Sequence, residues 1–176
     1  MIGSPVRRRL VGQSLYVGLV LMSLFLRLLP IDPGRVGWPG PDLILCLTLA
    51  WVLRRPDQVP VLIIAAAVLV EDVLLLRPIG LWAAVVVLGS EAARRREPRW
   101  REHPFVVEWL RVALLMAAMM LGMRAVMALF LLPLPPLGQV TLHLLATIAA
   151  YPPVVLAAQW LGLRRAAPGE QDAMRY

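Results

Sequence analysis

The chain has 176 residues, of which 60% are hydrophobic and 16% are charged, and its mean hydropathy is +0.73. A soluble domain is typically about 45–50% apolar and about 25% charged. Because the additional apolar residues are gathered into runs long enough for bilayer helices, the composition leaves no room for a separate soluble domain.

The net charge of +7 comes with arginine as the only basic residue type, because all 18 Lys and Arg positions are Arg. Most of these arginines lie in the gaps between apolar runs, as residues that set membrane orientation do. Basic patches that bind nucleic acid normally lie on a soluble scaffold with aromatic or groove-reading elements, and the sequence contains none. We therefore expect no nucleic-acid partner.

The first apolar run covers residues 10–29 and follows three arginines at positions 7–9. A signal peptide has an apolar core of about 7–15 residues and ends at a small-residue cleavage site. This run is longer and ends in Arg-Leu-Leu-Pro, so it predicts an uncleaved first transmembrane helix. The stretch 30–41 is rich in Pro and Gly and predicts a loop, with Trp38 at the membrane interface.

The second helix is expected over residues 43–53, behind Pro41 and with Asp42 as its N-cap. It has 11 residues, whereas a helix needs about 20 residues to span a bilayer unaided. Local thinning of the bilayer, flanking polar residues or burial among neighbours would accommodate it. Cys46 lies in this helix and is the only cysteine, which excludes an intrachain disulfide and predicts a small hydrophobic packing role.

The third and fourth helices are expected over residues 59–76 and 81–93. A basic turn with Arg54 and Arg55 precedes the third helix, and the tight turn Arg-Pro-Ile-Gly at 77–80 joins the two. The following stretch, 94–103, contains five arginines and predicts a loop that faces solvent.

The fifth helix is expected over residues 105–132, where prolines stop it, and the sixth over residues 140–163. The adjacent Pro152 and Pro153 should kink or break the sixth helix. The pattern therefore predicts an all-α, polytopic membrane protein in which residues 1–163 form a single six-helix transmembrane domain. Residues 164–176 are expected to form a polar cytoplasmic tail.

The distribution of arginines predicts the orientation. With the N-terminus inside, the outer loops hold only Arg35 and Arg77. The inner segments hold 13 arginines: Arg7, Arg8, Arg9, Arg54, Arg55, Arg94, Arg95, Arg96, Arg99, Arg101, Arg164, Arg165 and Arg175. This asymmetry follows the positive-inside rule, so we expect both termini in the cytoplasm.

Glu71 and Asp72 lie late in the third apolar run, where charge is costly in lipid. The third and fifth helices both run outward in this topology, and Arg124 of the fifth falls in the same half of the bilayer. An ion pair with one of the acids is therefore predicted. It would be either a structural salt bridge or part of a polar site for a ligand or a partner's helix; alternatively, Arg124 extends to the outer surface.

The fifth helix carries two further patterns. Met116, Met120, Met123 and Met127 recur at three- and four-residue spacing, which is typical of a core and also of adaptable binding surfaces. Small residues nearby allow another helix to approach closely. The set predicted to pack against a partner's helix is Ala117, Ala118, Met120, Gly122 and Met123. Glu108 and Arg111 have the spacing of an ordinary helix-start ion pair.

The sequence contains no common catalytic motif in a suitable context. His103 and His143 fall on opposite sides of the membrane in the predicted topology, which argues against a shared metal site. His143 is expected to be a hydrogen-bonded residue at the interface. We therefore expect a protein that is not an enzyme and uses no cofactor.

Several of these features together resemble the MreD family, the rod shape-determining membrane proteins of bacteria. The segments RRPDQVP and RPIGLWA look especially like alphaproteobacterial members. The basic N-terminus, the proline-led second helix and the Pro/Gly turn also follow the family layout. The positions that carry the resemblance are Pro41, Asp42, Trp51, Pro56, Asp72, Arg77, Pro78 and Gly80.

The resemblance implies a multi-pass subunit of the bacterial inner membrane that binds the bitopic protein MreC. Through MreC it would act indirectly on the glycosyltransferase and transpeptidase of lateral peptidoglycan synthesis, in the cell-elongation machinery. It also implies a fold similar to the substrate-binding subunit of energy-coupling-factor transporters. This similarity supplies an alternative function, a small-molecule-binding transporter subunit with a pocket near Glu71, Asp72 and Arg124. An integral-membrane enzyme acting on lipid is a third class, against which the absence of a catalytic cluster counts.

Overall fold

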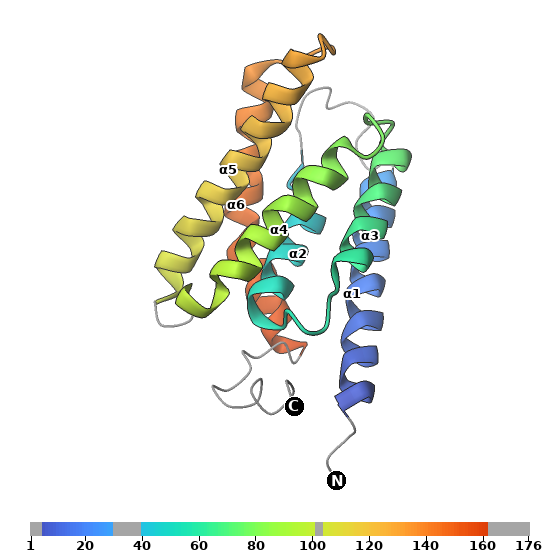
Figure 1. The fold of residues 1–176 in the computed structure, drawn as a ribbon, viewed down its shortest axis with the longest axis vertical. Coiled ribbons are helices and arrows are strands. Elements are labelled where there is room, and N and C mark those ends of the chain that lie inside the picture. Colours follow the sequence, from blue (N-terminus) through green and yellow to red (C-terminus); the bar gives the residue numbers. More distant parts are fainter. Residues whose placement is uncertain (1–4, 30–39, 101–103, 162–176) are drawn as a thin grey trace.

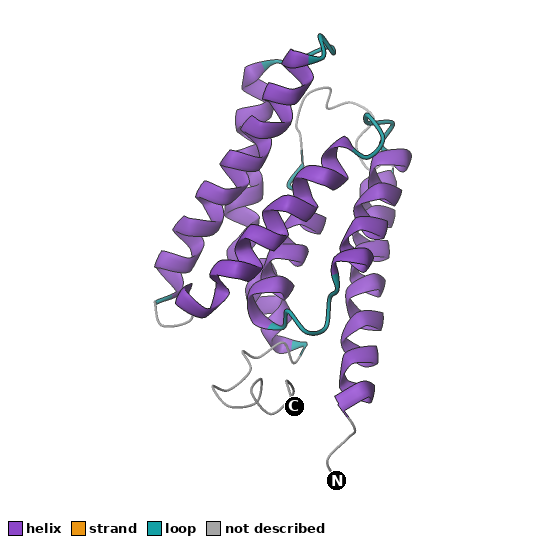
Figure 2. Cartoon of the chain, in the orientation of Figure 1, coloured by secondary structure: helices purple, strands orange, loops and turns teal. Residues whose placement is uncertain are grey.

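The structure is a computed structural model that describes residues 5–29, 40–100 and 104–161, and these residues form helices and no strand (Figures 1 and 2). The six helices are α1 (Pro5–Leu28), α2 (Leu43–Arg54), α3 (Val61–Leu74), α4 (Leu81–Trp100), α5 (Phe105–Leu129) and α6 (Leu137–Trp160). The all-α class predicted from the sequence is confirmed. The predicted tail, 164–176, and most of the predicted loop 30–41 lie outside the described residues.

The helices are arranged as three neighbouring pairs (Figure 1). The α1–α3 pair lies on one side, the α5–α6 pair lies on the other, and α2 and α4 cross between them. The beginning of α1, the α2–α3 turn and the end of α6 lie at the lower end in Figure 1. The α3–α4 and α5–α6 turns lie at the upper end, and we refer to these as the lower and upper ends of the bundle.

Three helices, α1, α5 and α6, are long and apolar enough to cross a membrane by length and composition. Many of their leucines point outward; Leu114 and Leu121 of α5, for example, are each 65% exposed. Such a surface is unfavourable in water and is the surface that lipid requires. The described chain is therefore compatible with a membrane-embedded protein.

The central helix is α2, and its short length explains its position. Its 12 residues extend about 18 Å, whereas the hydrocarbon core of a bilayer is about 30 Å thick. Every residue from Ile44 to Arg54 is buried, because α1, α4 and α6 surround the helix. Of the three ways in which a short helix was expected to be accommodated, burial among neighbours is the one observed.

The predicted N-cap of α2 is present, together with polar contacts that the sequence did not predict. Asp42 accepts a hydrogen bond from the Leu45 amide at 3.0 Å, as predicted for an N-cap. Cys46 is fully buried, and its thiol donates to the Thr147 carbonyl of α6. The hydroxyl groups of Tyr16 and Thr48 share a hydrogen bond of 2.8 Å between α1 and α2. These contacts fix the rotation and the depth of α2 relative to its neighbours.

The largest difference from the predicted helix boundaries is at the end of the fourth helix. The stretch 94–103 was expected to be a loop, but α4 continues through its first seven residues to Trp100. The side chain of Arg94 donates to the carbonyls of Pro56 and Val59, both at 2.7 Å, and so ties α4 to the α2–α3 turn. Basic residues near a helix C-terminus also interact favourably with the helix dipole.

The prolines of α6 do not interrupt it, since one helix runs from Leu137 to Trp160. A proline lacks the N–H that would bond to the carbonyl four residues earlier, and for Pro152 this is the carbonyl of Ile148. The indole N–H of Trp109 donates to that same carbonyl at 3.0 Å. A side chain of α5 thus replaces one hydrogen bond that the prolines remove, as expected inside a bundle.

Candidate functional site

Glu71 is the centre of a polar cluster at the upper end of the bundle. Its carboxylate is buried and lies 2.6 Å from Nη1 of Arg27 in the last turn of α1. Nη1 of Arg77, in the α3–α4 turn, lies 3.4 Å from the same oxygen. Arg27 is also 4.0 Å from Asp42. The cluster therefore connects α1, the start of α2 and the end of α3.

The structure does not form the predicted ion pair between Arg124 and the acids of α3. Arg124 instead donates from Nη1 to the Pro135 carbonyl at 2.7 Å, in the turn between α5 and α6. The reason lies in the helix order, because α4 packs between α3 and α5 (Figure 1). The countercharges that Glu71 requires come from Arg27 and Arg77, and the sequence pattern did not single out Arg27.

Asp72 has a different task from its neighbour Glu71. Its Oδ2 accepts hydrogen bonds from the amides of Gly80 at 3.0 Å and Ala83 at 3.2 Å. These amides belong to the start of α4, so Asp72 caps that helix from the end of α3. Gly80 has a φ of +83°, which is strained for any residue with a side chain. The acid and the glycine together fix the tight α3–α4 turn.

Trp51 is buried in α2 against Tyr16, and the other positions that suggested the MreD family lie at helix ends or turns. Pro41 and Asp42 begin α2, and the Pro56 carbonyl accepts from Arg94. The remaining positions, Asp72, Arg77, Pro78 and Gly80, form or brace the α3–α4 turn. The guanidinium of Arg77 also lies 5.8 Å from the ring centre of Trp82, within cation–π range. Each position thus has a structural role in this chain.

A cavity of about 470 Å³ lies beside the polar cluster at the upper end. Small-molecule sites typically measure about 300–1,000 Å³. Its polar lining includes three arginines, a histidine and a glutamine, and its apolar lining is dominated by methionine, proline and tryptophan. The lining residues are Arg27, Gly40, Arg77, Pro78, Trp82, Met120, Met123, Arg124, Met127, Pro135, Gln139, Val140 and His143.

His143 helps to close this cavity. Its Nδ1 lies 2.7 Å from the Gly40 carbonyl, which joins α6 to the residue before the α2 cap. This confirms the expectation of a hydrogen-bonded histidine. His103, the other histidine considered in the sequence analysis, lies outside the described residues. Within the described part of the chain, no group of three His, Cys, Asp or Glu side chains has the arrangement of a metal site.

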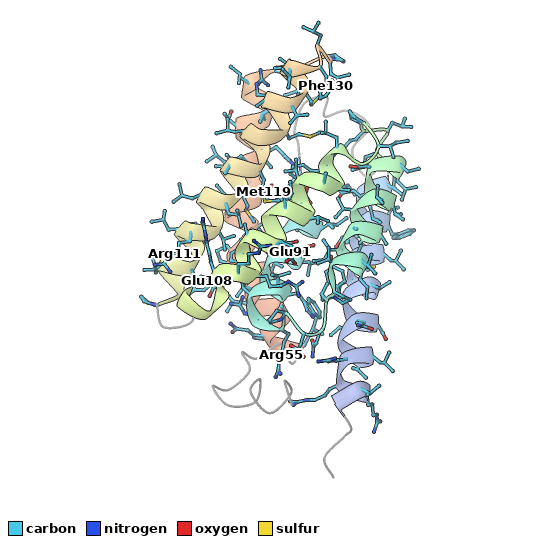
Figure 3. The ribbon with its side chains drawn as sticks, viewed as in Figure 1. Arg55, Glu91, Glu108, Arg111, Met119 and Phe130 are labelled. Atoms are coloured by element: carbon cyan, nitrogen blue, oxygen red, sulfur yellow. The ribbon has the colours of Figure 1, made fainter. Side chains whose placement is uncertain are left out.

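A second buried polar cluster lies at the lower end. Arg54, at the end of α2, is 1% exposed, and its Nη1 lies 3.1 Å from Oε1 of Glu108, which is also 1% exposed. The hydroxyl of Tyr151 donates to the same carboxylate oxygen at 3.1 Å. In Figure 3, Glu108 and Phe130 lie at opposite ends of α5. The sequence pattern assigned Glu108 to a helix-start pair with Arg111 and missed its contact with α2.

The structure divides the residues predicted to pack against a partner's helix. Met120 is buried in the core and, with Met123, lines the cavity. Met119, which was not predicted, packs against Gly89 of α4 and lies between α4 and α5 in Figure 3. Ala117 is half-buried, whereas Ala118 is exposed, and a Cβ at Gly122 would meet no atom within 4 Å. Of the predicted set, Ala118 and Gly122 are therefore the residues that leave room for a partner's helix.

The chain matches no protein-family model, and neither a curated protein nor a solved structure is similar to it at a significant level. Its function must be inferred from its own residues and their arrangement.

The geometry of Glu71 predicts which arginine it is coupled to. In a double-mutant cycle with Glu71→Gln and Arg27→Leu, we expect a coupling of about 0.5–2 kcal/mol, because the two groups share a direct charged contact. Unfolding in detergent measures it. The matched cycle of Glu71→Gln with Arg124→Leu should give less than about 0.5 kcal/mol. A larger coupling to Arg124 than to Arg27 would contradict this arrangement.

The lower cluster predicts strongly non-additive substitutions. Arg54→Met should destabilise the protein by about 3–5 kcal/mol, because it leaves Glu108 buried without its cation. Adding Glu108→Leu should recover part of that loss, since the uncompensated charge is then removed as well. The same unfolding assay compares the single and double variants. Simple addition of the two losses would show that the carboxylate is not paired with Arg54.

Proposed function

We propose that this protein is a non-enzymatic membrane subunit that holds the transmembrane helix of a bitopic partner, as an MreD-like component of the cell-elongation machinery. The partner is an MreC-like protein, and the peptidoglycan glycosyltransferase and transpeptidase are reached through it. The resemblance in layout and the structural roles of its positions support this proposal.

The observation that carries the proposal is the outer face of α5. Ala118 and Ala125 are exposed, and Gly122 between them has open space where its side chain would be. Residues spaced by four and three lie on one helix face. Apolar side chains gain little by leaving lipid for protein, so helix association in a bilayer depends on close backbone approach across small residues. This face offers such an approach.

The proposed topology has six transmembrane segments in the bacterial inner membrane, with both termini in the cytoplasm. The start of α1, the α2–α3 turn and the later part of α4, which carry most of the described arginines, lie toward the lower end of the bundle (Figure 1). The upper end has Arg27, Arg77 and Arg124 among its described residues. The lower end is therefore the cytoplasmic side under the positive-inside rule.

The topology can be checked with single cysteines in a Cys46→Ser background. Gly138→Cys, in open space at the upper end, should react with an impermeant thiol reagent added outside. Arg96→Cys, exposed near the lower end, should react only after the membrane is permeabilised. The opposite pattern would show that the bundle is inverted.

The partner-binding face can be tested with Gly122→Leu. The substitution adds bulk without polarity, so membrane insertion should be unchanged while co-purification of the MreC-like partner falls by about tenfold or more, equivalent to about 1.4 kcal/mol. Gly18→Leu is the matched control, because a Cβ at Gly18, as at Gly122, would meet no atom within 4 Å. Full retention by Gly122→Leu, or a loss confined to Gly18→Leu, would overturn the assignment to α5.

The cavity favours a second candidate function, the small-molecule-binding subunit of a membrane transporter. For this candidate, the bound partner is a small molecule in the cavity rather than another protein. Purification from the native membrane separates the two, because a stoichiometric small molecule without a retained partner supports the transporter subunit.

A further inference from the structure

We propose that the cavity at the upper end binds a phosphate-bearing amphiphile, with the phosphate at the three arginines and the apolar part against the methionines and Trp82. This site is independent of the partner-binding face. At about 100° per residue, Ala118 and Gly122 lie roughly opposite Met120 and Met127 around α5. The cavity therefore stays available when a helix covers the outer face.

The charge of the lining favours an anion. Arg27, Arg77 and Arg124 reach the cavity from three different segments, and among the lining residues that the structure describes there is no Asp or Glu. The nearby acids, Glu71 and Asp42, are buried behind Arg27. One of the arginines, Arg124, contacts a neutral carbonyl rather than an acid. The surface that a ligand meets is therefore positively charged.

The arginines are also held in place before a ligand arrives. Glu71 fixes Arg27 and Arg77 through one oxygen, and the Pro135 carbonyl fixes Arg124. All three contacts use Nη1, and a guanidinium has five N–H donors in total. Donors therefore remain for phosphate oxygens, which planar guanidinium groups bind well. Holding charged side chains in advance reduces the entropy that binding costs.

The rest of the lining favours an amphiphile over a purely polar anion. Met120, Met123 and Met127 form an apolar wall on α5, and Trp82 of α4 adds to the apolar lining. Methionine side chains adapt to irregular apolar shapes. The arginines lie at helix ends, in the last turn of α1, the α3–α4 turn and the last two turns of α5. Arginines at helix ends, beside an apolar wall, suit a ligand whose phosphate is joined to an apolar chain.

The test uses the full-length protein in a neutral detergent and counts bound molecules by native mass spectrometry. The probes are dioctanoylphosphatidylglycerol, dioctanoylphosphatidylcholine and inorganic phosphate. We expect one phosphatidylglycerol per chain, bound more tightly than phosphatidylcholine and retained where phosphate alone is not. Arg124→Gln should weaken that binding about tenfold, as the loss of a charged hydrogen bond predicts. Arg96→Gln, at the other end of the bundle, should leave it unchanged.

A second variant, which changes no charge, separates a loss of binding from a folding defect in Arg124→Gln. Met123→Trp fills the apolar wall while keeping every charge, and it should also weaken phosphatidylglycerol binding. Equal binding of phosphatidylcholine, or unchanged binding by both variants, overturns the proposal. If inorganic phosphate binds to the same extent as phosphatidylglycerol, the cavity is a site for free phosphate, and the proposal of an amphiphilic ligand is overturned. Arg124→Gln should retain the partner that Gly122→Leu loses, so failure here is distinguishable from failure of the proposed function.

Discussion

The rest of the bundle depends on the enclosure of α2, a helix too short to cross a bilayer. Its N-terminus carries Asp42 and its C-terminus carries Arg54, and both side chains are buried. An acid at the N-terminus and a base at the C-terminus suit the helix dipole. Burying them nevertheless requires partners, because an unpaired charge is unfavourable away from water. The neighbouring helices supply those partners at both ends.

The two polar clusters are therefore the two ends of one arrangement. At the upper end Arg27 of α1 lies near the Asp42 carboxylate, and the Thr147 hydroxyl of α6 accepts a hydrogen bond from the Asp42 amide. At the lower end Glu108 and Tyr151 approach Arg54 from α5 and α6. Buried ion pairs often contribute little net stability compared with apolar packing, but they penalise any misplaced helix. In this bundle they set the depth and the rotation at which α2 is held.

Features that depend on local sequence were predictable. The cap at Asp42, the turn at Gly80 and the short length of α2 follow from the identity and spacing of a few adjacent residues. The pairing of Glu71 was not predictable in the same way, because it depends on α4 lying between α3 and α5. The extension of α4 to Trp100 was missed because Arg94 finds carbonyls in a distant turn. The continuity of α6 depends equally on Trp109, a residue of another helix.

The enclosure of α2 has a consequence for biogenesis. A helix with enough apolar length can enter the bilayer alone and associate afterwards, and α1, α5 and α6 have that length. The 12 residues of α2 do not, and two of the helices that surround it, α4 and α6, are synthesised after it. Arg54 has no carboxylate partner until the ribosome has made α5, and α2 has no complete apolar enclosure until it has made α6. Membrane integration of this protein therefore ends with the cooperative docking of an early segment, rather than with the insertion of its last one.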